Sequence, residues 1–153
     1  MITSAGILLY RRAPVLEVFI AHMGGPFWER KDERAWSIIK GEYEEDEEPF
    51  TAAQREFQEE TGSPAPSGPA IELGEVRQSS RKRTVAWAIE SDFDPASVRS
   101  NTFTLEWPKG SGEQREFPEI DRAEWFDTDT ARKKLVKGQI PLIDALEREI
   151  LGE

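Results

Sequence analysis

The stretch GEYEEDEEPFTAAQREFQEETGS occupies residues 41–63 and carries nine acidic side chains but only one basic side chain, Arg55. Like charges repel one another, so a folding chain ordinarily spreads them over its surface. The first part of the stretch, Glu42–Glu48, has the composition of a solvated acidic face. The second part combines its carboxylates with a regular apolar pattern, and this pattern predicts a helix.

The predicted helix has a start signal, an apolar stripe and a stop signal. Pro49 suits the first turn, where its missing N–H costs little. Phe50, Ala53 and Phe57 follow at positions i, i+3 and i+7, which gives one apolar face. Gly62 is a favourable residue at the carboxyl end of a helix. We therefore expect one amphipathic helix between Pro49 and Gly62.

Three carboxylates share one edge of this helix. At about 100° per residue, Glu59 lies about 60° to one side of Glu56 and Glu60 about 40° to the other. Like charges at this spacing cost roughly 0.2–0.5 kcal/mol per pair even on an exposed helix. A divalent cation that prefers hard oxygen ligands, Mg²⁺ or Mn²⁺, would remove this penalty. Arg55 can pair with Glu59 at i, i+4 and hold that carboxylate in one orientation.

The remaining pattern alternates strands with a few helices. Strands are expected at residues 2–10, 15–22, 36–39, 71–78, 83–90, 102–107 and in a segment that ends at 126. Residues 108–114 are expected to be a loop that joins the last two strands. A helix is predicted from Asp127 or Thr128 to about Val136, and a last helix begins at Pro141. The order predicts a single α/β domain over residues 1–153, with helices packed on a mixed sheet.

Composition excludes several classes of function. The net charge of −10 and the pI of about 4.8 argue against binding to nucleic-acid polymers or anionic membranes. Without Cys the chain forms no disulfide, and its one histidine, His22, cannot supply a His-rich metal site. We find no membrane-spanning apolar run and no signal-peptide pattern, so a cytoplasmic monomer or homodimer is expected.

The spacing of residues 41–63 resembles the Nudix box, G-x5-E-x7-R-E-U-x-E-E-x-G-U, in which U is a bulky apolar residue. All seven fixed letters are present, and Phe57 satisfies the first apolar position. Ser63 departs from the last one. The segments WSIIKGE (36–42) and EIDRAEWF (119–126) also resemble family segments, although Ile39 stands where proline is common. The likeness extends from residue 3 to about 146.

The resemblance implies an α/β/α sandwich and hydrolysis of a pyrophosphate bond with Mg²⁺ or Mn²⁺. By position, it implies a metal site made of Glu56, Glu59, Glu60 and the Gly41 carbonyl. Glu47 and Arg55 would orient the box, and Glu119 matches an additional ligand or general base of some members. We take Glu56 as the general base as well as a ligand. The alternative is a non-catalytic Nudix domain that binds a nucleotide. A third hypothesis is an acidic interaction module whose match to the box is accidental.

The sequence indicates a class of substrate but not an individual compound. Markers for ADP-ribose or dinucleoside polyphosphate cleavage are absent from the positions after Ser63, which are Ser79, Ser80 and Arg81. The segment WSIIKGE (36–42), which leads into the box, and the short chain length nevertheless resemble those of family members that cleave dinucleoside polyphosphates or nucleoside triphosphates. We therefore favour these substrates. Substrate contacts are predicted at Lys40, Trp28, Arg77, Arg81 and Lys82. His22 and Trp36 are expected to be structural, and Trp87, Trp107 and Trp125 are expected in the core.

Overall fold

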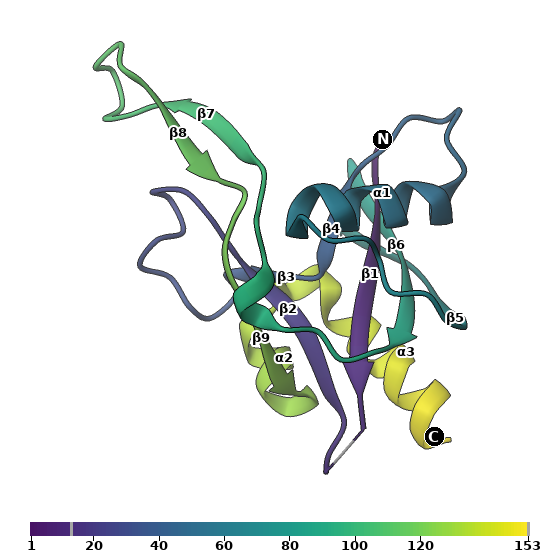
Figure 1. Cartoon of the computed structure of the whole chain (residues 1–153). Helices are drawn as coiled ribbons and strands as arrows, with labels where there is room; N and C mark the ends of the chain where they lie inside the picture. The colour runs from purple at the N-terminus through teal and green to yellow at the C-terminus, as the bar shows by residue number, and fades with distance from the viewer. Residues whose placement is uncertain (13, 153) are drawn as a thin grey trace.

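The structure is a computed structural model, and it describes residues 1–12 and 14–152. Its strands are β1 (Ile2–Arg11), β2 (Glu17–Met23), β3 (Trp36–Ser37), β4 (Ile39–Glu42), β5 (Ala70–Ser79), β6 (Lys82–Glu90), β7 (Thr102–Glu106), β8 (Gln114–Pro118) and β9 (Ile120–Asp127). Its helices are α1 (Pro49–Thr61), α2 (Thr128–Lys134) and α3 (Ile140–Leu151), with short 3-10 turns η1 (Pro95–Ser97) and η2 (Lys137–Gln139). Figure 1 shows how these elements are arranged.

The central strand β1 holds the main sheet together. It pairs in parallel with β6 along residues 2–10, and β5 follows as the antiparallel neighbour of β6. On its other side β1 pairs with β2 only through Leu9–Arg11. The two strands then diverge, so that β4 pairs with the first half of β1 and β3 pairs with the end of β2. β9 closes the outer edge of β2, and the result is a mixed seven-stranded sheet.

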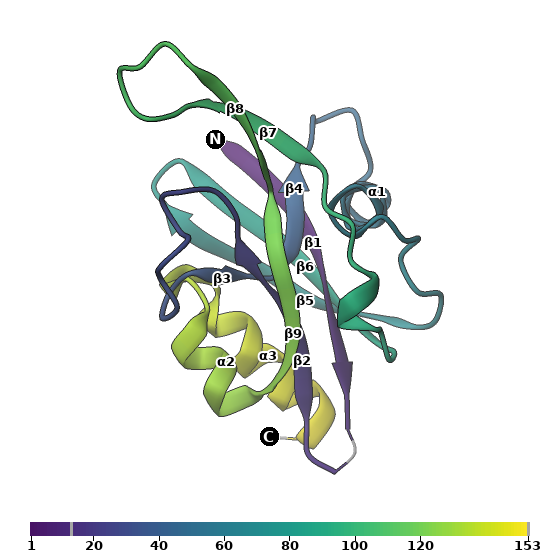
Figure 2. The same cartoon turned by 60° about the vertical axis from the view of Figure 1, so that its left-hand side comes forward.

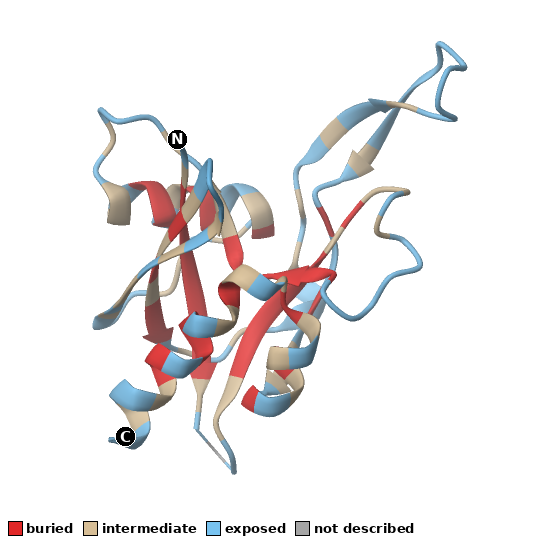
Figure 3. Cartoon of the chain, turned by 180° about the vertical axis from the view of Figure 1, so that it is seen from behind, coloured by how far each residue is buried: buried red, intermediate tan, exposed pale blue. Residues whose placement is uncertain are grey.

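Each face of this sheet carries a core beneath helices, as Figures 2 and 3 show. One core lies under α1, where Phe57 of the helix packs on alternate strand residues such as Ala5, Ile7, Leu9 and Phe19. The other lies under α2 and α3 and includes Leu8, Val18, Ile20, Trp36 and Leu142. Successive strand residues point to opposite faces, which is why β1 is apolar almost throughout. Among residues 1–12 and 14–152 no helix is long and apolar enough to cross a membrane.

Most of the predicted elements are confirmed. The helix at Pro49–Thr61 ends at Gly62 as expected, and the last helix carries Leu142 and Leu146 on its buried face. Asp127 caps α2, although that helix stops at Lys134 rather than continuing to Val136. The sandwich of helices on both faces of a mixed sheet is the predicted α/β architecture.

The segment after residue 101 differs from the prediction. Residues 114–118 form an additional strand, β8, which pairs with β7 in a separate two-stranded sheet. The predicted loop ends at residue 114, and the alternation of Arg115, Glu116 and Phe117 is too short to indicate a separate strand before the one that ends at 126. The prediction that Trp107 lies in the core is wrong, because its exposed fraction is 37% and it joins neither core. Trp87 and Trp125 do pack against the core under α1.

A buried glutamine connects the two halves of the divided sheet. Gln139 of η2 is fully buried, and its Oε1 accepts a hydrogen bond of 2.9 Å from the N–H of Ile38, the residue between β3 and β4. Its Nε2 donates to Ser37 Oγ at 3.0 Å. Gln139 therefore satisfies polar groups that the strand ladder leaves unpaired at the point where the sheet divides.

We expect the Gln139→Leu substitution to destabilise the fold by about 1–3 kcal/mol, because it leaves the Ile38 N–H and the Ser37 hydroxyl without their partner in the interior. Urea unfolding measures the change. Gln54→Leu, on the exposed side of α1, is the matched control and should change stability by less than about 0.5 kcal/mol. Equal stabilities of the two variants would contradict this role of Gln139.

Candidate functional site

Helix α1 has a defined start and end, which fixes the direction of its side chains. Glu48 caps the amino end, and its carboxylate accepts hydrogen bonds from the N–H groups of Phe50 and Thr51 at 3.1 and 2.9 Å. At the other end Gly62 adopts a φ of 78°, and its N–H bonds to the carbonyl of Gln58. With the apolar side packed on the sheet, the acidic edge of α1 faces β4.

Arg55 is bonded to three carboxylates at once. Its Nε and Nη2 donate to the two oxygens of Glu47 at 2.8 and 2.9 Å, a bidentate arrangement. Its Nη1 donates to Glu56 Oε2 at 2.7 Å and to Glu59 Oε2 at 3.0 Å. The predicted pairing of Arg55 with Glu59 is confirmed, and the guanidinium also lowers the pKa of Glu47. Arg55 thus ties the loop before α1 to the acidic edge of the helix.

Glu56 lies against the backbone of Gly41. A Cβ atom placed on Gly41 would lie only 1.7 Å from Glu56 Oε1, so no residue with a side chain fits without displacing the carboxylate. Glu56 is 7% exposed. Burial raises the pKa of Glu56, and the bond to Arg55 opposes that shift. The glycine therefore lets strand β4 approach an oriented, buried carboxylate.

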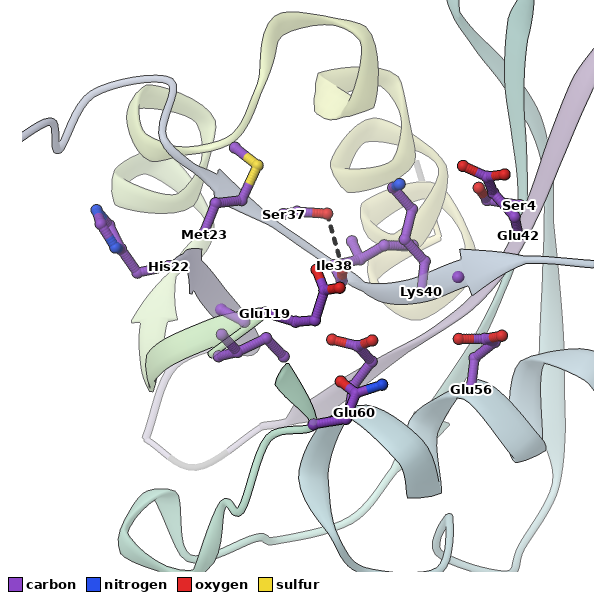
Figure 4. Close-up of a pocket in the computed structure, with 14 residues that line it drawn as sticks. Ser4, His22, Met23, Ser37, Ile38, Lys40, Glu42, Glu56, Glu60 and Glu119 are labelled. Carbon is purple, nitrogen blue, oxygen red and sulfur yellow. Dashed lines mark hydrogen bonds between the residues drawn. The ribbon is translucent and has the colours of Figure 1, made fainter. Parts of the chain in front are cut away.

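Glu60 and Glu119 are acidic groups without a balancing ion pair among the described residues. Burial, together with the negative charges of Glu119 and Glu56, raises the pKa of Glu60 to about 8. Burial also raises the pKa of Glu119. Figure 4 shows both carboxyl groups in the space between α1 and the sheet. This pair differs from the carboxylates around Arg55 because, among the described residues, no guanidinium is bonded to either of its members.

These groups line a pocket of about 420 Å³ at the point where β1 and β2 diverge. Lys40 lies in the same lining and makes no ion pair with the described residues; burial and the nearby Lys82 lower its pKa. Gly41, Glu56, Glu60 and Glu119 are the other predicted site residues in the lining. Ser4 and Asn101 are lining residues that the sequence did not predict, because neither belongs to a motif. The split of the sheet therefore creates a pocket with carboxylates and one amine.

The donor set suits a hard divalent cation but is not already gathered into a cluster. Among residues 1–12 and 14–152 no group of three Asp, Glu or His side chains is close enough to hold a metal ion. Glu59 lies outside the pocket lining and is held by Arg55. Glu56, Glu60 and the carbonyl of Gly41 offer oxygen donors at the pocket, and burial together with the neighbouring carboxylates raises the pKa of Glu60. The residues present fit Mg²⁺ or Mn²⁺.

The other predicted substrate contacts lie outside this lining. Trp28 is partly buried against the core under α2 and α3, and Arg77, Arg81 and Lys82 belong to the β5–β6 hairpin. Arg77 lines a different cavity, beside Gly138 of η2. A role for these four residues in binding substrate stays a prediction.

His22 is structural, as predicted. Its side chain is fully buried, with Nδ1 2.8 Å from Asp121 Oδ1 and Nε2 2.6 Å from the carbonyl oxygen of Lys31. Trp36 is 1% exposed and packs edge-on against the imidazole. The histidine thereby fixes the loop that follows β2 to strand β9.

Solved structures with similar folds cover nearly the whole chain. A C. elegans Ap4A hydrolase binary complex superposes with a TM-score of 0.66 at 16% identity, covering 98% of this chain and 99% of that one. The NUDIX domain of Shewanella oneidensis NrtR, complexed with ADP ribose, gives 0.65 at 14% identity, covering 98% and 88%. The E. coli ORF135 protein gives 0.65 at 20%, covering 99% and 92%. At these identities the likeness establishes the fold.

The sequence comparisons establish the family. No curated protein sequence matches the chain. The family model for the NUDIX domain, however, matches residues 2–146, which include the whole of the sheet and the acidic helix with its preceding glycine. The protein belongs to the NUDIX family.

Proposed function

We propose that this protein is a hydrolase that requires Mg²⁺ or Mn²⁺ and cleaves a pyrophosphate bond in a compound containing a nucleoside diphosphate. The observation that carries the proposal is the excess of carboxyl groups in one pocket, Glu56, Glu60 and Glu119, beside the unpaired amine of Lys40. Such a pocket repels an anionic substrate until cations enter it. Divalent cations would supply the positive charge that both these carboxyl groups and the phosphate groups of a substrate require.

The proposed metal ligands are Glu56, Glu59, Glu60 and the carbonyl oxygen of Gly41. Glu56 and Glu60 face the pocket, and Gly41 lies against Glu56. Glu59 is bonded to Arg55 and would turn from that bond to join them. When bound, the cation would polarise a phosphoryl oxygen and lower the pKa of a water molecule.

Glu56 is our candidate for the general base. Its carboxylate is oriented on one side by Arg55 and on the other by Gly41, and burial raises its pKa toward the working range of a base. Glu119 approaches the pocket from the end of the β7–β8 hairpin and is the second candidate for accepting the proton of water. Arg55 holds the acidic edge in place, and Lys40 would contact a phosphate oxygen.

The proposed substrates are dinucleoside polyphosphates and nucleoside triphosphates. The similarity of the fold to an Ap4A hydrolase from C. elegans is consistent with this choice. A single domain over residues 1–153 would act alone or as a homodimer. A panel containing diadenosine polyphosphates, nucleoside triphosphates and ADP-ribose, with product masses as the measurement, tests the proposal. Absence of cleavage with either metal across the panel would contradict it.

We expect Glu60→Gln and Glu59→Gln each to lower kcat by about 10²-fold or more, because each removes a charged oxygen from the proposed metal site. Glu56→Gln should do the same, and Glu119→Gln measures the contribution of the second candidate base. Glu45→Gln, in the exposed acidic run, is the control and should keep the activity of the parent protein. If Glu59→Gln and Glu60→Gln both keep full activity, the metal site is wrongly assigned.

The stability of the metal-free protein should fall as pH rises through the interval between the unfolded and folded pKa values of Glu60. The ordinary pKa of a glutamate carboxyl is 4.5 and the pKa of Glu60 in the folded chain is about 8, so folding takes up a proton in this interval. Linkage limits the slope from one such group to about 1.4 kcal/mol per pH unit. We expect Glu60→Gln to flatten this dependence in urea unfolding with a chelator present.

Added Mg²⁺ provides the complementary measurement. It should restore stability to the parent protein above about pH 8, where Glu60 is ionised. It should have a much smaller effect on Glu60→Gln, which lacks the charge. Identical pH profiles for the parent protein and this variant would show that Glu60 is ionised as easily in the folded chain as in the unfolded one.

A further inference from the structure

The β7–β8 hairpin has one apolar face that belongs to neither core. Phe103 and Phe117 are direct cross-strand partners with ring centroids 6.0 Å apart, and Leu105 follows on the same face of β7. The alternate residues Thr102, Thr104, Gln114 and Glu116 are exposed and polar. Figure 2 shows this hairpin extending beyond the body of the molecule. Phe103, Leu105 and Phe117 therefore belong to neither core, although Phe103 approaches Gly25 and the charged Arg115 lies opposite Leu105 on the same face.

The hairpin is held in shape by its own hydrogen bonds. The carboxylate of Glu106 accepts bonds from the N–H groups of Gly110 and Gly112 at 2.9 and 3.1 Å, and these bonds fix the loop between the strands. The N–H of Trp107 donates to the carbonyl of Glu113 at 2.9 Å. A two-stranded hairpin by itself is only marginally stable in water, so these bonds matter. They give the aromatic pair a defined position.

Three segments connect this aromatic pair to the rim of the pocket. The pocket lining includes Met23, Asn101 and Glu119. Two positions along the chain from these residues lie Gly25, Phe103 and Phe117, respectively. The three latter residues are close in space, because a Cβ on Gly25 would lie 2.8 Å from Phe103 Cζ. Two residues span at most about 7 Å of chain. The aromatic pair thus lies within about 7 Å of chain of the rim residues Asn101 and Glu119.

The aromatic residues of the neighbouring loop are less available. Trp28 packs against the core, and Phe27 stands edge-on against Trp28 with a ring-centroid distance of 4.9 Å. The amine of Lys31 lies 3.5 Å from the centre of the Phe27 ring and covers one of its faces. Phe103 and Phe117 carry no such cation among the described contacts.

We propose that the apolar face of the β7–β8 hairpin, formed by Phe103, Leu105 and Phe117, binds the base of a nucleotide whose phosphates lie in the pocket. This inference rests on the proposed function, since the pocket supplies the phosphate end. A nucleobase is flat and apolar on its faces, and stacking on an aromatic side chain is worth about 1–3 kcal/mol per base. Because stacking reads no hydrogen-bond pattern, the hairpin accepts both purines and pyrimidines, with purines bound more tightly.

Calorimetric titration in Mg²⁺ with two probes tests the proposal. Adenosine diphosphate carries a base, whereas methylenediphosphonate offers two phosphorus groups without one. We expect Phe103→Leu and Phe117→Leu to weaken binding of adenosine diphosphate about 5- to 100-fold and to leave methylenediphosphonate unchanged. Leucine preserves the apolar face but removes the ring. Phe117→Trp keeps an aromatic ring and should bind adenosine diphosphate as the parent protein does. Thr104→Ala, on the polar face, is the matched control and should leave both affinities unchanged.

Several outcomes overturn the assignment. The first is equal affinity of the parent protein and the leucine variants for adenosine diphosphate. The second is a loss of affinity for both probes to the same extent. The third is that the parent protein does not bind adenosine diphosphate. A parent dimer that separates in Phe117→Leu, measured by sedimentation, would instead assign the face to a second copy of the chain. The parent protein could bind adenosine diphosphate through the rings of Phe103 and Phe117 and yet cleave no compound of the substrate panel. That result would contradict the proposed hydrolase activity and support the base-binding site.

Discussion

The acidic edge of α1 depends on one guanidinium group. Glu47, Glu56 and Glu59 are all bonded to Arg55, which sits among charges that would otherwise repel one another. The bond to Glu47 reaches across the acidic loop, so the same side chain positions the helix and the loop before it. Truncating Arg55 would leave the half-buried part of this network without its cation, and such uncompensated charges are far more costly than exposed ones. The order of the helix, its loop and β4 therefore depends on a single cation.

The carboxylates of residues 41–63 divide into three groups by their surroundings. Those of Glu44 and Glu45 are exposed, those around Arg55 are paired, and Glu60 is left facing Glu119 with its pKa raised. Glu60 faces the pocket between β1 and β2, where burial and the neighbouring carboxylates raise its pKa. Its surroundings therefore differ from those of the carboxylates that Arg55 holds.

The sequence is sufficient for the helix and the sandwich but not for the surroundings of the site. The signals at Pro49, Phe57 and Gly62 are local, and each is found in the structure at its expected place. The spacing of the box indicates that Gly41 and Glu56 belong to one site, but the close contact between them and the approach of Glu119 to Glu60 emerge only from tertiary packing. Strand β8 is not predicted because a five-residue segment with Phe117 as its large apolar side chain shows no clear alternation, so the sequence assigns no pairing partner to β7.

The parallel pairing of β1 with β6 has a consequence for how this chain folds. Thr3 and Arg83 are neighbours across these strands although they are 80 residues apart in sequence. During synthesis β1 therefore precedes β6, and one of its edges has no partner until about 80 further residues have been added. Contacts of such long range slow the folding of a domain, and an unpaired apolar strand is prone to aggregation. The central strand β1 is accordingly an apolar segment whose pairing waits for a distant part of the chain.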